Sequence, residues 1–200
     1  MSTLKTGALR GTSGTADSVQ LHASNQSVTF PGDVTVSGSM TGGGKVLQVV
    51  SNTVTAVLNN DTASGGNWIP GHLETSITPS ATSSKILITG CIQVDAAIAM
   101  GVSAQLQRDS ALIAGANGPA AGNRQRVHSG VLTSGATTMV SMMINYLDSP
   151  SSTSSETYRL KFFHTSGNTR QLYINRSSED TDGTNFSRPV STITLTEISG

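Results

Sequence analysis

Four histidines and many serines give this chain the residue types of a hydrolytic triad. In a triad, a histidine takes the proton of a nucleophilic serine and an acid orients that histidine. The sequence lacks the Gly-x-Ser-x-Gly segment that presents the serine on a sharp turn in α/β-hydrolases. Because 55 of the 200 residues are serine or threonine, a hydroxyl group near a histidine is expected by chance. We therefore predict no catalytic role for His22, His72, His128 or His164.

Acidic residues cluster in one segment, 177–185, which reads SSEDTDGTN. Asp180, Asp182 and Asn185 offer oxygen atoms around Gly183, and calcium is a cation that takes oxygen ligands. Their spacing does not match the calcium loop of an EF-hand, so an exposed acidic turn or an acidic loop at a subunit boundary is the favoured interpretation. Two carboxylates at a set separation would be needed for glycoside hydrolysis, and this cluster does not indicate such a pair. We expect no metal and no cofactor.

Three further residues are candidates for binding a glycan or another ligand. Trp68 lies in the segment GGNWIP, where an exposed indole would stack on a sugar ring. The favoured alternative is that Trp68 closes one end of the folded domain. Arg124 and Arg126 are two residues apart and would share a face in a strand, where they would dock an anionic glycan or a phosphate. Pairing with an acid of a neighbouring subunit is the favoured alternative for these arginines.

Charge and targeting signals exclude several classes of function. Lys plus Arg and Asp plus Glu are equal at 12 each, and no basic stripe indicates nucleic-acid binding. Zero net charge suits a chain built into an assembly better than a freely diffusing monomer. No signal peptide opens the sequence, and no apolar run approaches the roughly 20 residues of a membrane-spanning helix. We expect a soluble protein made in a cytoplasm, without membrane insertion.

The single cysteine, Cys91, excludes an intrachain disulfide and a cysteine-based zinc site. Its neighbours in the segment KILITGCIQV predict a thiol buried within a strand.

The elements that position these residues are predicted to be strands. Threonine favours pleated strands, whereas serine and glycine favour turns. No helical pattern of 10–15 residues separates the apolar runs, which excludes a parallel α/β sheet. About ten short strands predict an all-β, antiparallel, jelly-roll-like β-sandwich over residues 45–200. The predicted strands are 46–51, 74–78, 85–94, 99–108, 111–116, 126–132, 138–147, 157–164, 172–175 and 192–198.

Residues 1–44 differ in composition from the predicted sandwich, which we call the head. They are rich in Gly, Ser and Thr and are predicted to form a short extended β leader. Three short alternating units lie within it, at 19–21, 28–30 and 34–36, and each is too short to bury a core within one chain. Three copies around a common axis would bury these apolar side chains between chains. The leader is thus predicted to anchor the protein or form a trimer shaft through Leu21, Val28, Phe30, Val34 and Val36.

Several short segments spread over most of the chain carry a resemblance. They are 8–12 (ALRGT), 28–31 (VTFP), 69–71 (IPG), 76–80 (SITPS), 83–88 (SSKILI), 147–150 (LDSP), 172–177 (LYINRS) and 191–198 (STITLTEI). In this order they resemble tail-fibre-like virion structural proteins of marine bacteriophages. The chain departs from that pattern at His72 and Leu73, where one apolar residue is expected.

The resemblance implies a non-enzymatic structural protein of a bacteriophage virion, with a tail fibre or spike as the first expectation. We predict a homotrimer that contacts other virion proteins through residues 1–44. Two alternatives stay open, a capsid decoration or head-fibre protein and a receptor-binding module that recognises a host surface glycan. One Trp and three Tyr count mildly against the glycan module, because sugar sites use aromatic residues.

Overall fold

The computed structural model of this protein describes residues 45–63, 69–135, 138–166 and 170–200. These residues form eleven strands and no helix, and none of them builds a helix long and apolar enough to span a membrane. The predicted leader and Trp68 lie outside the described residues. The same holds for the anchoring candidates Leu21, Val28, Phe30, Val34 and Val36.

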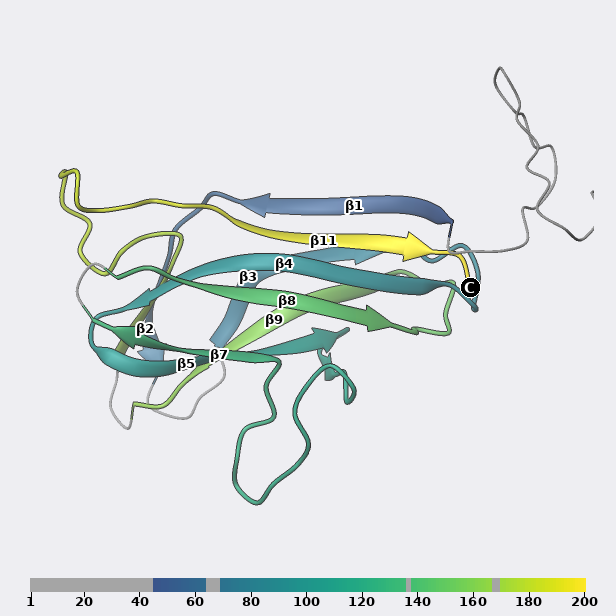
Figure 1. The fold of residues 1–200 in the computed structure, drawn as a ribbon, viewed down its shortest axis with the longest axis horizontal. Helices are drawn as coiled ribbons and strands as arrows, with labels where there is room; N and C mark the ends of the chain where they lie inside the picture. Colours follow the sequence, from purple (N-terminus) through teal and green to yellow (C-terminus); the bar gives the residue numbers. More distant parts are fainter. Residues whose placement is uncertain (1–44, 64–68, 136–137, 167–169) are drawn as a thin grey trace, which may run out of the picture. The chain divides into compact units, whose positions relative to one another are not determined.

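The strands form two antiparallel sheets that pack face to face (Figure 1). We name them sheet A and sheet B. Sheet A has the order β1-β11-β4-β10-β2. β11 and β10 pair with successive parts of β4, and β8 also pairs with β4. Its strands are β1 (Val46–Val54), β2 (Leu58–Ala63), β4 (Lys85–Ala96), β8 (Val140–Asp148), β10 (Arg170–Ile174) and β11 (Ser191–Ile198).

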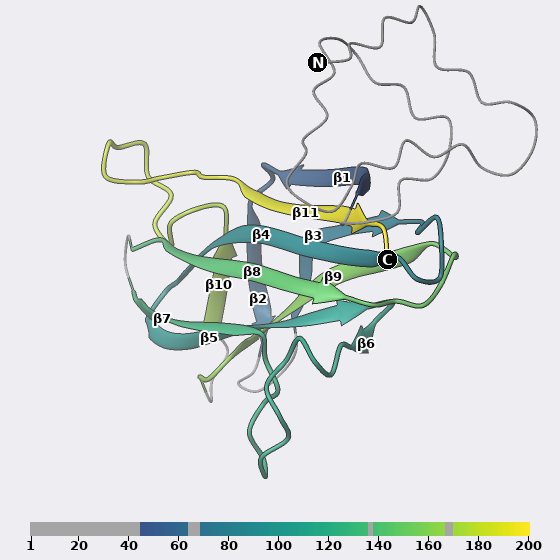
Figure 2. The ribbon, with the colours of Figure 1, turned by 45° about the vertical axis from the view of Figure 1, so that its right-hand side comes forward.

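Sheet B has the order β3-β9-β5-β6, with β7 also paired to β5. Its strands are β3 (Ile69–Ile77), β5 (Ala99–Arg108), β6 (Ala111–Leu112), β7 (Ser129–Ser134) and β9 (Glu156–His164). The short strand β6 of sheet B and the strand β10 of sheet A are labelled in Figure 2. The all-β class and the two antiparallel sheets predicted from the sequence are confirmed in the described residues. Jelly-roll connectivity and a trimer stay predictions.

Strict alternation of side chains builds the core between the sheets. Every second residue of β9 and of β11 is buried, because neighbouring residues of a strand point to opposite faces. The inward residues are mainly Ile, Leu, Val, Phe and Tyr, which favour strands and remove large apolar areas from water. The largest fully buried apolar side chains are Ile86, Ile88, Ile92, Leu106, Met142, Tyr158, Leu160, Phe162, Leu172, Ile193 and Leu195.

Gly90 lies at the centre of sheet A, opposite Ile193 of β11 and Ile144 of β8. A Cβ atom at this position would lie 2.6 Å from the carbonyl oxygen of Thr192 and 3.3 Å from the Cδ1 atom of Ile144. Since a ladder carbonyl cannot move without breaking strand pairing, we expect Gly90→Ala to lower the free energy of unfolding by about 1–3 kcal/mol. Urea denaturation measures this change.

The control for Gly90→Ala is Gly118→Ala, whose new Cβ atom would lie at an ordinary 3.8 Å from the carbonyl oxygen of Val127. We expect the control to stay within about 0.5 kcal/mol of wild type. Equal stability of the two variants would contradict the close packing of β4 against β11.

Candidate interaction surface

The outward side of sheet A presents a regular array of side chains from β8, β4, β11 and β1. Residues paired directly across antiparallel strands point to the same face, so the registers define three rows of four residues. We call this array the outer face of sheet A. Its rows are Met143, Cys91, Thr192, Thr53; Asn145, Thr89, Thr194, Ser51; and Leu147, Leu87, Thr196, Val49.

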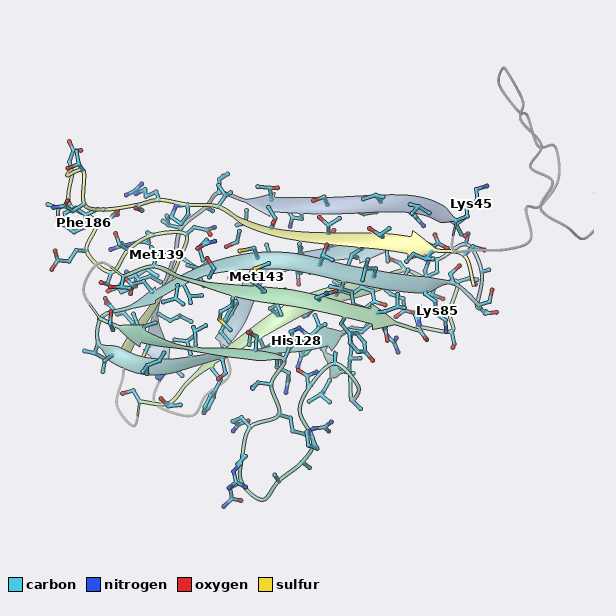
Figure 3. The ribbon with its side chains drawn as sticks, in the orientation of Figure 1. Lys45, Lys85, His128, Met139, Met143 and Phe186 are labelled. Atoms are coloured by element: carbon cyan, nitrogen blue, oxygen red, sulfur yellow. The ribbon has the colours of Figure 1, made fainter. Side chains whose placement is uncertain are left out.

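No residue of the outer face of sheet A carries a charge. Its centre is formed by threonines, and the hydroxyl groups of Ser51 and Thr194 lie 2.9 Å apart. Each flank carries exposed apolar side chains among polar ones: on β8 Met143 is 64% exposed and Leu147 50%, and on β1 Val49 is 58% exposed. Met143 is labelled on β8 in Figure 3. A contiguous exposed surface with these apolar flanks is typical of a protein–protein contact.

The outward side of sheet B has a different character. Arg159 and Lys161 of β9 point outward between buried neighbours, and the Nε atom of Arg159 lies 3.4 Å from an Oε2 atom of Glu74 on β3. Leu132 of β7 is 75% exposed on this sheet. The three rows of the outer face of sheet A thus lack charge, whereas the outward side of sheet B carries several charged residues. Lys85 lies beside the third row, at the start of β4, and its ammonium group donates to the hydroxyl group of Ser149 at 2.8 Å.

The prediction of a buried thiol at Cys91 is wrong about the burial. Cys91 lies in a strand as predicted, but it points to the outer face of sheet A and is only partly buried. Gly90 precedes it and Ile92 follows it as inward residues, so the apolar run around Cys91 mixes both faces of β4. Its Sγ atom accepts a hydrogen bond from the side chain of Gln93 at 3.2 Å.

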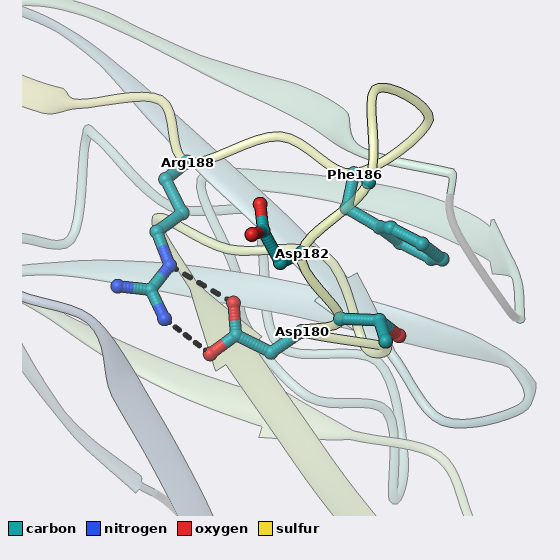
Figure 4. Close-up of a pocket in the computed structure, with 6 residues that line it drawn as sticks. Asp180, Asp182, Phe186 and Arg188 are labelled. Atoms are coloured by element: carbon teal, nitrogen blue, oxygen red, sulfur yellow. Dashed lines mark hydrogen bonds and ion pairs between the residues drawn. The ribbon is translucent and has the colours of Figure 1, made fainter.

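A second candidate site is a pocket of about 310 Å³ in the loop between β10 and β11. Asp180, Asp182, Phe186 and Arg188 line it together with Thr181 and Gly183 (Figure 4). Arg188 binds both carboxylate oxygens of Asp180, with its Nε atom 2.9 Å from Oδ1 and its NH2 atom 2.5 Å from Oδ2. The pocket thus combines an aromatic ring with a paired arginine and a second carboxylate.

The calcium candidates of this loop are only partly brought together. Asp180 and Asp182 line the pocket, whereas Asn185 does not. The carboxylate of Asp180 is shared by two arginines, because Arg176 approaches it at 3.5 Å in addition to Arg188. The hydrogen bond from Arg188 holds the pKa of Asp180 below its ordinary value. Two guanidinium groups neutralise the carboxylate of Asp180, so the geometry favours an arginine-braced loop.

The arginine pair predicted on one strand face is arranged differently. β7 begins at Ser129, and both arginines lie in the preceding loop, 113–128, so they do not share a pleated face. Arg126 braces this loop, since its guanidinium donates to the carbonyl oxygens of Gly118 at 2.8 Å and Ala114 at 3.2 Å. Arg124 is exposed in the same loop. The loop protrudes from the sandwich in both ribbon views (Figures 1 and 2).

Comparison with known proteins gives little. No protein-family model matches the sequence, and no curated protein matches it. One solved structure that resembles the fold is titled "Structure of infectious bursal disease virus Gx strain", with 12% sequence identity and a TM-score of 0.40. The likeness covers 76% of this chain and 41% of that chain, so this chain spans about two fifths of the other. A likeness at this level assigns neither a family nor a function.

Proposed function

We propose that this chain is a structural component of a bacteriophage virion, a tail fibre or spike protein that assembles as a homotrimer. The observation that carries the proposal is the uncharged outer face of sheet A with its exposed apolar flanks. Burial of such a surface within an assembly is favourable, because it removes apolar side chains from water and no charged group of the surface loses its hydration. The sequence resemblance to tail-fibre-like virion proteins supports the same class.

The buried acids support a mechanical role. Asp148 is bound by Arg108 and Tyr158, and Glu197 by Ser80 and Gln48. Each of these carboxylates accepts hydrogen bonds that join separate strands or turns of the sandwich. Acids held in this way stabilise the fold and are not available to a substrate. We extend the proposal to a non-enzymatic protein, with the sandwich as a head and residues 1–44 docking on other virion proteins.

Location in the particle tests this function. Purified virions from the genome that encodes this chain are labelled with a gold-conjugated antibody against it and viewed by electron microscopy. We expect gold particles on the tail. Gold particles spread over the capsid would support the alternative of a decoration or head-fibre protein. Absence of the chain from purified virions by both labelling and mass spectrometry would overturn the proposal.

A receptor-binding role is the second candidate function, and the pocket in the β10–β11 loop favours it. Phe186 offers a ring for sugar stacking, and Asp182 and Arg188 offer polar partners for hydroxyl groups. We expect Phe186→Ala to weaken binding to host envelope glycans by about tenfold on a glycan array, since stacking supplies about 1 kcal/mol or more. Lys161→Ala, on the outward side of β9, serves as the control. No binding by the wild-type protein at high concentration would remove this candidate.

A further inference from the structure

We infer that the partner of the outer face of sheet A is a second copy of this chain. The inference rests on the proposed function and deepens it, because it names the surface through which the trimer forms. The three rows of the face run across β8, β4, β11 and β1, and these strands are held in one continuous register. The face is therefore one continuous area of a hydrogen-bonded sheet and not a set of independent side chains.

Charge is the first argument for a second copy. The chain carries 12 basic and 12 acidic residues, and none of them is in the three rows. Burial of an unpaired charge is strongly unfavourable, so a partner that brings charged side chains to this face would lose their hydration without finding ion pairs. The three rows of another copy bring no charge, and Lys85 beside them is hydrogen-bonded to Ser149 at the end of the face. By contrast, the outward side of sheet B, with Arg159, Lys161 and Glu74, fits water or a charged partner.

The chemistry of the rows is the second argument. Threonine and serine hydroxyl groups both donate and accept hydrogen bonds, so with the faces of three copies turned toward a three-fold axis the hydroxyl groups of one copy can pair with those of the next. Met143 and Leu147 on one flank and Val49 on the other would lose their exposed apolar area in such a contact. Apolar exposure continues along β1 to Val46 and Leu47, at 54% and 39%.

Size is consistent with an assembly contact that other parts of the chain complete. Strands lie about 4.8 Å apart, so four strands give a face about 19 Å wide. The twelve residues of the rows make up roughly half of the 20–30 residues that a stable interface takes from each partner. Val46 extends the same surface at the start of β1, in a row that continues through Ile198 to Lys85.

The single cysteine allows a direct test in the full-length protein. Cys91 lies in the first row beside Met143, so its reaction with a thiol reagent reports whether the face is covered. We expect wild-type protein to have three times the chain mass of 20.6 kDa and a slowly reacting thiol. Met143→Glu places a charge on the face and should give folded protein of lower mass whose thiol reacts about tenfold faster.

The matched control is Leu132→Glu, which places the same charge on an exposed residue of sheet B. We expect it to keep the wild-type mass and the slow thiol reaction. Because Met143 is 64% exposed, Met143→Glu should retain a cooperative urea transition, and this measurement separates lost assembly from lost folding.

Three outcomes would overturn the inference. If Met143→Glu and Leu132→Glu both stay trimeric with a reactive thiol, the trimer forms elsewhere, and the proposed function stands while the surface assignment fails. If wild-type protein is a monomer with a protected thiol at every concentration, residues of the same chain cover the face. If it is a monomer with a reactive thiol, the face is open to water. A monomer would also remove the homotrimer from the proposed function, whereas labelling of virions tests the place of the chain in the particle independently of all three outcomes.

Discussion

Replacement of Asp148 by alanine is expected to destabilise the sandwich by about 3–5 kcal/mol. The side chain of Asp148 is 7% exposed, and its Oδ2 atom lies 2.5 Å from the NH1 atom of Arg108. The hydroxyl group of the buried Tyr158 donates to the same oxygen at 2.7 Å. Loss of the carboxylate leaves the buried phenol of Tyr158 without its acceptor and leaves Arg108 with Glu156 as its remaining acid, and both losses are costly in a largely buried network.

The phenol of Tyr158 and the guanidinium of Arg108 keep their protons in the neutral range. Burial and the hydrogen bond to Asp148 raise the pKa of Tyr158 well above its ordinary value, so the phenol stays a donor. Burial lowers the pKa of Arg108, but the charge of Asp148 outweighs this and raises it, so the guanidinium stays charged. The Nε atom of Arg108 also lies 3.4 Å from Glu156, which adds a second carboxylate to the network.

Urea denaturation at pH 7 measures the Asp148 effect. Asp148→Asn keeps an acceptor oxygen for Tyr158 but removes the charge that pairs with Arg108. We therefore expect its free energy of unfolding to lie between those of wild type and Asp148→Ala. Tyr158→Phe removes only the hydroxyl group and should cost about 1–2 kcal/mol. A loss below about 1 kcal/mol for Asp148→Ala would show that the network does not contribute as a buried ion pair.

Most of the strands could be predicted from the sequence, because a half-buried strand repeats with period two. In β11 the apolar residues Ile193 and Leu195 alternate with threonines, and the structure buries the apolar ones. β2 was missed. Its sequence LNNDTA has asparagine and aspartate, which disfavour strands, yet it pairs with β10 at the edge of sheet A. Tertiary pairing therefore overrides local preference at this edge.

The loop between β6 and β7 shows a second limit of sequence prediction. Strands were predicted over 111–116 and 126–132, but β6 ends at Leu112 and β7 begins at Ser129. The side chain of Asn117 replaces a ladder partner, since it accepts from the backbone N–H of Leu106 at 3.0 Å and donates to its carbonyl oxygen at 2.8 Å. A side chain that substitutes for a strand leaves no periodic trace in the sequence.

The outer face of sheet A could not be predicted, although the sequence contains part of its signal. Alternation places Thr192, Thr194 and Thr196 on one side of a strand. The neighbours of that strand follow only from the register, which sets Cys91 and Met143 beside Thr192. The absence of charge becomes a property of a surface only when β1, β4, β8 and β11 are known to be adjacent. Long-range pairing supplies this information, and local patterns do not.

Glu197 gives the second large expected effect, because it joins β11 to β1 and to the turn after β3. Its Oε1 atom accepts from the backbone N–H of Ser80 at 2.7 Å and from the Ser80 hydroxyl at 2.6 Å. Its Oε2 atom accepts from the amide of Gln48 at 2.6 Å. Burial alone would raise the pKa of Glu197, but hydrogen bonds from Ser80 and Gln48 outweigh burial and lower it to about 2.

The direction of the pH dependence follows from this lowered pKa. In the unfolded chain Glu197 titrates near the ordinary value of 4.5, and in the folded chain near 2. The folded state thus binds the proton more weakly, so the stabilisation is fully present above pH 4.5 and is lost as the pH falls through 2. The carboxylate contributes on the order of 2 kcal/mol, which unfolding measurements from pH 7 to pH 2 should resolve.

Glu197→Gln tests the origin of that acid sensitivity. The variant keeps one acceptor oxygen but turns an amide group toward donors, so we expect a loss of about 2 kcal/mol at pH 7. Since glutamine does not titrate, the difference from wild type should shrink as the pH falls from 4.5 to 2. Glu179→Gln, at an exposed position of the β10–β11 loop, is the control and should leave the pH profile unchanged. If the free energies of unfolding of Glu197→Gln and wild type differ by the same amount at every pH, residue 197 stabilises the fold through its shape and not through its charge.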